Sequence, residues 1–253
     1  MLVIGDLHGN AEDFRRIEEL FLNERRRSSQ THLLLLGDLV HAPDREARRK
    51  NPALYDYDDG SLEIVRGVAS LQRRFPDRLH LLLGNHDHGH IGGPRTSKFH
   101  LDEVTHLEMR LDAAQIEAVQ QLFVGALLLV AAPCGAIFSH GSPDDSLAEL
   151  SQLDQSPAHP ALRSILGAYG QQPEITARML QQLSRSSGLD LTLVIHGHDR
   201  DEEGYFVESD NQLCPVAFGA PRQNKRYLKL DLAARYASAA ALRVGKEILR
   251  LYP

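Results

Sequence analysis

The sequence has few cysteines, no long apolar run and no excess of positive charge, and each absence narrows the class of protein. Only Cys134 and Cys214 occur among the 253 residues, and neither lies in a CxxC or a Cys/His zinc-binding spacing. A disulfide framework is therefore not indicated, and two reduced, buried thiols are expected. Because no apolar run approaches the length that crosses a bilayer, no membrane partner is expected.

The charge balance argues against a general nucleic-acid-binding protein. The formal net charge is −6, whereas such proteins carry basic patches or stripes. Hydrophobic residues make up 42% and charged residues 25%, which is typical of a soluble globular protein. Residues 1–9 already have the pattern of a short strand and a polar turn, which leaves no room for a signal peptide. A cytoplasmic protein is expected.

Histidine is abundant, with 13 residues, and it is the commonest metal ligand in proteins. Several of these histidines follow apolar runs and are flanked by glycine or aspartate. Five predicted strands end in this way, at residues 2–4, 32–36, 79–83, 136–138 and 191–195. The polar residues that follow them are Asp6 and His8, Asp38, Asn85 and His86, His140, and His196 and His198. This repetition predicts one metal site assembled from the carboxyl ends of neighbouring strands.

Segments with helical spacing separate the first strands. Apolar residues repeat every three or four positions in residues 11–27, 61–75 and 112–123. Strands that alternate with helices predict parallel βαβ units, whereas the short apolar runs at 205–207, 216–218, 227–232 and 242–251 predict antiparallel strands. We expect a single domain over residues 1–253. Residues 88–111 and 142–189 lie between the motifs and are candidate caps or walls of a pocket.

The motifs GDLHG (5–9), GDLV (37–40), GNHD (84–87), SHG (139–141) and a late GH (197–198) occur in the order found in the calcineurin-like metallophosphoesterases. The sequence resembles this superfamily from residue 2 to about residue 232. Three segments resemble its phosphoprotein (serine/threonine) phosphatase branch: IFSHG (137–141), HDRDEEGY (198–205) and FGAP (218–221). The resemblance implies an α/β (α+β) fold of four-layer type, with a central β-sandwich of mixed sheets flanked by helices.

The resemblance also implies a centre of two divalent metal ions and assigns its ligands. One ion is bound by Asp6, His8 and Asp38, and the other by Asp38, Asn85, His140 and His198. Such carboxylate, imidazole and amide ligands suit Mn²⁺, and also Fe²⁺ or Zn²⁺. His86 takes the role of general acid. His196 is expected to form a hydrogen bond near the site rather than to bind metal.

The second motif departs from the phosphatase branch. Where that branch has GDxxDRG, this chain has GDLVHAP, so His41 and Ala42 replace the aspartate that orients the acid histidine and the arginine that binds phosphate. His41 also echoes the GD-x-x-His of some phosphodiesterase branches and remains a candidate substrate-binding residue. The candidates for the missing carboxylate are Asp87 and Asp44, and those for the missing guanidinium are Arg45, Arg200 and Arg222.

These features favour a metal-dependent phosphoesterase that hydrolyses phosphomonoesters with a metal-activated water. No phosphoenzyme is expected, because no cysteine or serine nucleophile is required. The expected substrate is a phosphorylated protein, as for a serine/threonine phosphatase, or a small phosphoester. The alternative is a dinuclear phosphodiesterase or nucleotide-polyphosphate hydrolase. A non-catalytic metal-binding scaffold is disfavoured, because every implied ligand and the acid histidine are present.

Overall fold

The computed structural model describes residues 1–155 and 159–253, which form two β-sheets of five strands each. The first sheet has the order β10-β9-β1-β2-β3, and the second has the order β4-β5-β6-β8-β7. The strands of the first sheet are β1 (Leu2–Ile4), β2 (Leu33–Leu35), β3 (Leu79–Leu81), β9 (Arg226–Lys229) and β10 (Ile248–Arg250). Those of the second are β4 (Leu129–Ala131), β5 (Ala136–Ser139), β6 (Leu193–His196), β7 (Tyr205–Ser209) and β8 (Gln212–Pro215).

Both sheets are mixed, as the sequence predicts. In the first sheet β1, β2 and β3 run parallel, whereas β9 pairs antiparallel with β1 and with β10. In the second sheet β5, β6 and β8 run parallel, and the edge strands β4 and β7 are antiparallel to their neighbours. The carboxyl ends of β1, β2 and β3 therefore meet at one edge of the first sheet, and those of β5 and β6 meet at one edge of the second.

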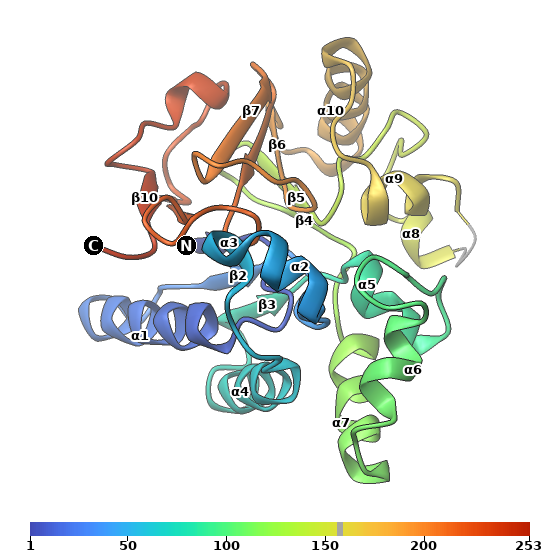
Figure 1. Cartoon of the computed structure of the whole chain (residues 1–253). Coiled ribbons are helices and arrows are strands. Elements are labelled where there is room, and N and C mark those ends of the chain that lie inside the picture. The colour runs from blue at the N-terminus through green and yellow to red at the C-terminus, as the bar shows by residue number, and fades with distance from the viewer. Residues whose placement is uncertain (156–158) are drawn as a thin grey trace.

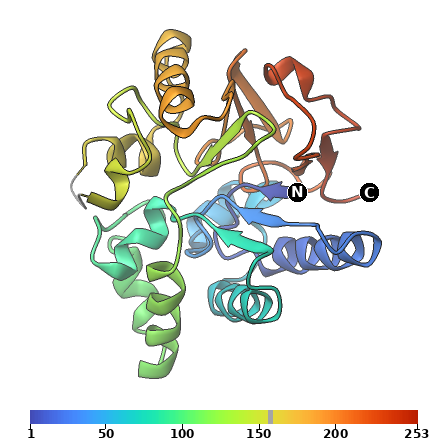
Figure 2. The same ribbon diagram turned by 180° about the vertical axis from the view of Figure 1, so that it is seen from behind.

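Helices cover the outer faces of the two sheets (Figures 1 and 2). The first sheet packs against α1 (Ala11–Arg27) and α4 (Ser61–Arg74), with α7 (Ala113–Val124) beside α4. The second sheet packs against α9 (Ala161–Gly167) and α10 (Pro173–Ser187). The shorter helices are α2 (Arg45–Lys50), α3 (Pro52–Tyr55), α5 (Asn85–His88), α6 (Glu103–Glu108) and α8 (Gln152–Gln155), with 3-10 turns at Gly89–Ile91 and Ala239–Ala241.

Alternation of side chains along the strands builds the layers, since successive residues of a strand point to opposite faces. In β1, Leu2 and Ile4 join the cluster with α1 and α4, whereas Val3 joins the cluster between the sheets. In β5, Phe138 points between the sheets and Ile137 points towards α10. The order of layers is helix, sheet, sheet, helix, which confirms the predicted sandwich.

Two expected strands differ in the structure. Residues 216–218 do not form a strand but cross between the sheets: Val216 N donates to Gly204 O (2.8 Å), and Phe218 N donates to Asp6 O (3.2 Å). The strand lies just before them, in β8. Of the expected strand 242–251, only β10 forms. Cys134 and Cys214 are free and buried, as expected. Within residues 1–155 and 159–253, no helix is long and apolar enough to span a bilayer.

Candidate metal centre and active site

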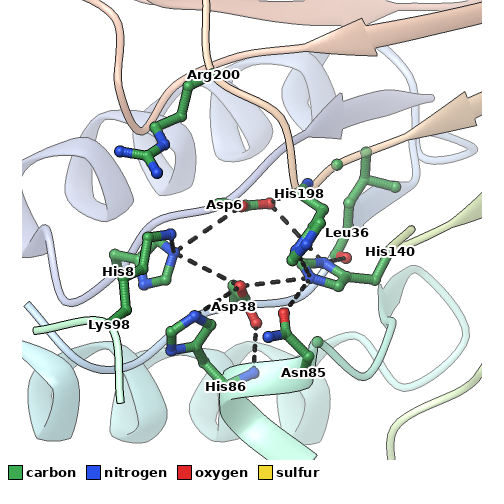
Figure 3. A network of polar contacts seen from close by, with 12 residues as sticks. Asp6, His8, Leu36, Asp38, Asn85, His86, Lys98, His140, His198 and Arg200 are labelled. Atoms are coloured by element: carbon green, nitrogen blue, oxygen red, sulfur yellow. Dashed lines mark hydrogen bonds and ion pairs between the residues drawn. The ribbon is translucent and has the colours of Figure 1, made fainter. Parts of the chain in front are cut away.

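The strand ends of the two sheets meet and bring the implied ligands together. Asp6 and His8 follow β1, Asp38 follows β2, and Asn85 opens α5 just after β3. His140 follows β5 and His198 follows β6, from the other sheet. In Figure 3 all six side chains lie around one point, with Asp38 at its centre. The pattern of apolar strand followed by polar residue thus produces a single cluster.

One carboxylate oxygen of Asp38 accepts a hydrogen bond, and the other does not. Its Oδ1 accepts a hydrogen bond from the backbone N–H of His86 (2.9 Å). Its Oδ2 lies 3.5 Å from His8 Nε2 and 3.4 Å from His140 Nε2. This Oδ2 is buried and has no hydrogen-bond partner among the described residues. A buried carboxylate oxygen without a donor is costly, so the position calls for a cation.

Hydrogen bonds also orient the side chains around His140. His140 Nδ1 donates to Leu36 O (2.9 Å), which leaves its Nε2 facing the cluster. That Nε2 is 3.0 Å from Asn85 Oδ1 and 3.2 Å from His198 Nδ1. Asp6 Oδ1 accepts from the backbone N–H of His198 (3.0 Å), which ties the first strand of one sheet to the loop of the other.

The backbone is bent to direct these side chains. His8, Asp38 and His198 have φ values of 42°, 50° and 68°, in the left-handed region that non-glycine residues rarely adopt. Such conformations cost free energy and persist at functional sites where the surroundings enforce them. At Gly84 a Cβ atom would lie 2.2 Å from Asp38 N, so only glycine permits the two strand ends to approach.

The separations fit divalent ions. Two ligand atoms that each lie about 2.0–2.2 Å from one ion are separated by about 3–3.5 Å, and the two distances at Asp38 Oδ2 fall at the upper end of this range. Two groups of three residues have ligand atoms within 4.8 Å of one another, and they share Asp38. These groups are His8, Asp38 and His86, and Asp38, His140 and His198. The residues fit a pair of ions with Asp38 between them.

The protonation states of His8, His198 and Asp38 suit metal binding, whereas an ion would have to displace a proton from His140: although burial opposes it, the charge of Asp38 raises the pKa of His140 to about 9. Burial, with the nearby Lys98 and His86 charges, holds the pKa of His8 well below its usual value. Burial and the charge of His140 lower the pKa of His198 to about 3. Burial would raise the pKa of Asp38, but His140 and His86 beside it hold this pKa well below its ordinary value. Neutral imidazole and ionised carboxylate are the forms that bind metals.

His86 is oriented by a residue that the sequence reading missed. Its Nδ1 lies 2.7 Å from Oε2 of Glu103, a fully buried carboxylate at the start of α6. Glu103 Oε1 accepts from the backbone N–H of Phe99 (2.8 Å), and the Thr96 hydroxyl donates to Oε2. Although burial opposes it, the hydrogen bond from His86 lowers the pKa of Glu103 to about 2. Glu103 therefore stays ionised and fixes the His86 ring with Nε2 towards Asp38 Oδ2, at 4.0 Å.

Asp87 does not orient His86, so that prediction is wrong. Its Oδ1 accepts from Leu39 N (3.0 Å) and its Oδ2 from Gly84 N (3.3 Å). Burial and the charge of Asp38 raise its pKa to about 7. Asp87 braces the loops that follow β2 and β3. The other candidate, Asp44, caps α2 by accepting from Ala47 N (2.7 Å).

His41 belongs to a buried histidine pair. Its Nε2 lies 3.0 Å from Nε2 of His90, and the two rings stack at 5.0 Å. His90 Nδ1 is in turn 2.9 Å from Glu108 Oε1. Burial, together with the charge of His90, lowers the pKa of His41 to about 3. Because its side-chain nitrogen is engaged by His90, the prediction that His41 contacts substrate is not supported.

Comparison with known proteins now decides the family. The family of calcineurin-like phosphoesterases matches residues 1–201 of the sequence. The chain belongs to this family. No curated protein sequence is significantly similar to it. The phosphoesterase fold is shared with a protein serine/threonine phosphatase from Saccharomyces cerevisiae, at a TM-score of 0.56 and 18% identity. That match covers 85% of this chain and 66%, just under two thirds, of the yeast chain.

A second structure with the phosphoesterase fold is a cold-active protein-tyrosine phosphatase from a psychrophilic Shewanella species. The TM-score is 0.52 at 14% identity, over 90% of this chain and 76% of the Shewanella chain. At these identities the two structures establish the shared fold, and the residues of the site have to be judged from their own geometry.

The three candidate arginines of this phosphoesterase lie in different surroundings. Arg45 is exposed on α2. Arg222 pairs with Glu12 (2.7 Å) and lies over the ring of Tyr252 (3.6 Å) on the outside of α1. Arg200 donates to the Tyr55 hydroxyl (3.3 Å) and lines a cavity of about 280 Å³. Figure 3 places it at the rim of the cluster. The structure supports Arg200 over the other two as a candidate for substrate contact.

Lys98 lines the same cavity and reaches the cluster itself, although no sequence motif pointed to it. Its Nζ is 3.3 Å from His8 Nε2 and lies over the ring of Phe218 at 4.9 Å. Burial lowers the pKa of Lys98, while the charges of Asp38 and Asp6 oppose the shift. An ammonium this close to the ligands is a favourable site for an anionic oxygen.

A larger cavity of about 740 Å³ opens beside Asn85. Residues from two segments between the motifs line it: His88, Pro94 and Thr96 from the first, and His159, Pro160, Leu162, Arg163, Leu166 and Gly167 from the second. Volumes of about 300–1,000 Å³ are typical of sites for small ligands. The cavity gives a substrate room to extend from Asn85 over α9.

Proposed function

We propose that this phosphoesterase is a metal-dependent phosphomonoesterase that acts on phosphoserine or phosphothreonine in proteins. The observation that carries the proposal is the His86–Glu103 pair beside the Asp38 cluster. An alkoxide such as that of serine is a poor leaving group and needs a proton as the P–O bond breaks. A histidine that is held by a buried carboxylate, with its other nitrogen facing the ligands, can supply that proton.

When bound, two divalent ions would neutralise phosphate charge and activate a water molecule, and we propose Mn²⁺ as the native ion. Side chains of the protein supply the proton transfer. Water oxygen bonds to phosphorus as the ester P–O bond breaks, and the proton on His86 Nε2 passes to the leaving oxygen. Glu103 accepts the Nδ1–H of His86 and stabilises the imidazolium form before transfer. His86 then regains a proton from solvent, and no bond forms between protein and phosphorus.

Lys98 is proposed to bind a non-bridging phosphate oxygen, in the role for which the sequence suggested an arginine. Replacing Lys98 with methionine keeps most of the aliphatic stem and removes the charge. We expect KM for p-nitrophenyl phosphate to rise about 10–100-fold, since a hydrogen bond to a charged group contributes about 1.5–3 kcal/mol. Steady-state kinetics measures this change.

The matched control is Arg222→Met, which removes a cation that pairs with Glu12 on the outside of α1. Its kcat and KM should equal those of the unmodified protein. An unchanged KM in Lys98→Met, or an equal rise in both variants, would contradict the assignment of Lys98.

The proposed reaction is tested with one pair of substrates. We expect metal-free protein supplied with Mn²⁺ to hydrolyse p-nitrophenyl phosphate faster than bis-p-nitrophenyl phosphate, because a monoester offers its phosphoryl oxygens to the ions and Lys98 together. Phosphoserine peptides should then be dephosphorylated as well. No hydrolysis of any of these substrates would favour a non-catalytic metal-binding scaffold.

The alternative function is a dinuclear phosphodiesterase or nucleotide-polyphosphate hydrolase. The observation that favours it is the cavity of about 740 Å³ beside Asn85, which is large enough for a nucleotide. A preference for the diester, or turnover of dinucleoside polyphosphates well above phosphopeptides, would establish this alternative.

A further inference from the structure

A second group of metal-ligating side chains lies outside the Asp38 cluster. It consists of His196 at the end of β6, Asp199 in the loop after it, and Cys214 in β8. Each offers one ligand atom, and the three atoms lie within 4.8 Å of one another. His196 and Cys214 are 0% and 1% exposed. The proposed hydrolysis uses none of these three side chains.

Two of the three side chains lack hydrogen-bond partners. In the described part of the chain, His196 Nε2 and Asp199 Oδ2 are buried and unpartnered, as Asp38 Oδ2 is at the centre of the active site. His196 Nδ1 lies 2.9 Å from Gly197 O. Since a carbonyl oxygen can only accept, Nδ1 carries the proton, and Nε2 of the neutral ring is a lone-pair acceptor. Two buried acceptor atoms without donors therefore belong to side chains that group with the Cys214 thiol.

The thiol cannot satisfy both acceptors. It has one weak S–H donor, which is placed to reach Gly197 O at 3.5 Å. Buried acceptors that face one another without donors destabilise a fold, whereas a cation between them would accept both lone pairs. Imidazole nitrogen, carboxylate oxygen and thiolate sulfur together form a ligand set that zinc prefers.

We propose that His196, Asp199 and Cys214 bind a single zinc ion, with a water molecule in the fourth position. Binding would release the thiol proton to solvent and form the Zn–S bond. Ligand bonds of about 2.0–2.3 Å place such atoms roughly 3.3–3.7 Å apart, so atoms that lie within 4.8 Å of one another need to draw together by no more than about 1.5 Å. Asp199 can supply this movement because it lies in a half-exposed loop, which also gives the ion a way in.

The proposed ion has a structural role. His198, a ligand of the Asp38 cluster, lies between His196 and Asp199 in the sequence. A zinc ion bound to both flanking residues and to Cys214 would fasten this loop to β8 and hold His198 in its left-handed conformation (φ 68°). The inference does not depend on which phosphoester is the substrate.

Cobalt is the probe, because a Co²⁺–thiolate bond gives an intense charge-transfer band in the near ultraviolet and the Asp38 cluster has no sulfur. We expect metal-free full-length protein to develop this band on addition of Co²⁺ and to lose it when Zn²⁺ is added. Cys214→Ser should abolish the band. The matched control, Cys134→Ser, replaces the other buried free thiol and should retain it.

The absence of a band in the unmodified protein, or its persistence in Cys214→Ser, would overturn the proposal. If Cys214→Ser does not fold, zinc-edge X-ray absorption of the zinc-loaded unmodified protein decides the question. A sulfur neighbour at about 2.3 Å supports the site, and a shell of nitrogen and oxygen alone rejects it.

Discussion

Replacing Asp38 with asparagine is expected to lower kcat by about 10³-fold or more, which corresponds to about 4 kcal/mol of transition-state stabilisation. The variant should also lose most of its bound divalent metal. Asp38 Oδ2 lies between His8 and His140, and an amide in its place removes the negative charge that two ions would share. Metal analysis and hydrolysis of p-nitrophenyl phosphate measure the two effects.

The fold should survive this change. The asparagine oxygen can still accept from the backbone N–H of His86, as Asp38 Oδ1 does. Asp112→Asn is the matched control, since Asp112 Oδ1 caps α7 by accepting from Gln115 N (2.9 Å), a role that asparagine fills equally well. It should keep metal and activity. Full metal content and activity in Asp38→Asn would show that the cluster is not the metal centre.

Replacing Glu103 with glutamine is expected to slow the dephosphorylation of a phosphoserine peptide by about 10²–10⁴-fold, the usual contribution of a general acid or base. Glutamine keeps the shape and can still accept from Phe99 N, but it no longer stabilises protonated His86. Hydrolysis of p-nitrophenyl phosphate should fall far less, because p-nitrophenolate leaves without a proton. The comparison of the two substrates isolates proton donation from metal binding.

His86→Asn should show the same difference between substrates while metal content stays unchanged. His86 also has a ligand atom within 4.8 Å of those of His8 and Asp38, so metal analysis of this variant is essential. Loss of metal, or an equal loss of activity on both substrates, would mean that His86 is a ligand and that Glu103 orients it for that purpose.

The residues of the Asp38 cluster could be predicted from the sequence because each one follows a recognisable local pattern. A short apolar strand, a glycine and a ligand occur together at Asp6, Asp38 and Asn85, and parallel strands bring such ends to one edge. The layered fold follows for the same reason, since alternation along β1 and β5 is visible in the sequence. His140 and His198, by contrast, reach the cluster only through the packing of the second sheet against the first.

Glu103 was missed because nothing local marks it. It lies 17 positions after His86, in a segment expected to form a cap or pocket wall, and the contact forms only when α6 packs beside α5. Asp87 was a natural candidate because it is next in sequence, but the helical turn of α5 points its carboxylate back at Gly84 and Leu39. A neighbour in sequence is often not a neighbour of the side chain.

Long-range contacts also explain why no local pattern marks the proposed substrate contacts or the Cys214 thiol. Arg222 is a candidate in the sequence because it carries a guanidinium, but its partner Glu12 is on α1, at the other end of the sequence. No local pattern marks Lys98, because its ammonium lies beside His8 only in the folded chain. Cys214 has no zinc-like spacing, and β6 and β8 place it beside His196 through their parallel pairing.

The most direct test of the central claim, that two divalent ions share Asp38, is electron paramagnetic resonance of metal-free protein titrated with Mn²⁺. Manganese suits the oxygen and nitrogen ligands of the Asp38 cluster and disfavours the thiolate of Cys214. We predict an exchange-coupled Mn²⁺ signal that grows in step with phosphatase activity and is absent from Asp38→Asn. Full activity with only the spectrum of isolated Mn²⁺ would contradict the shared centre.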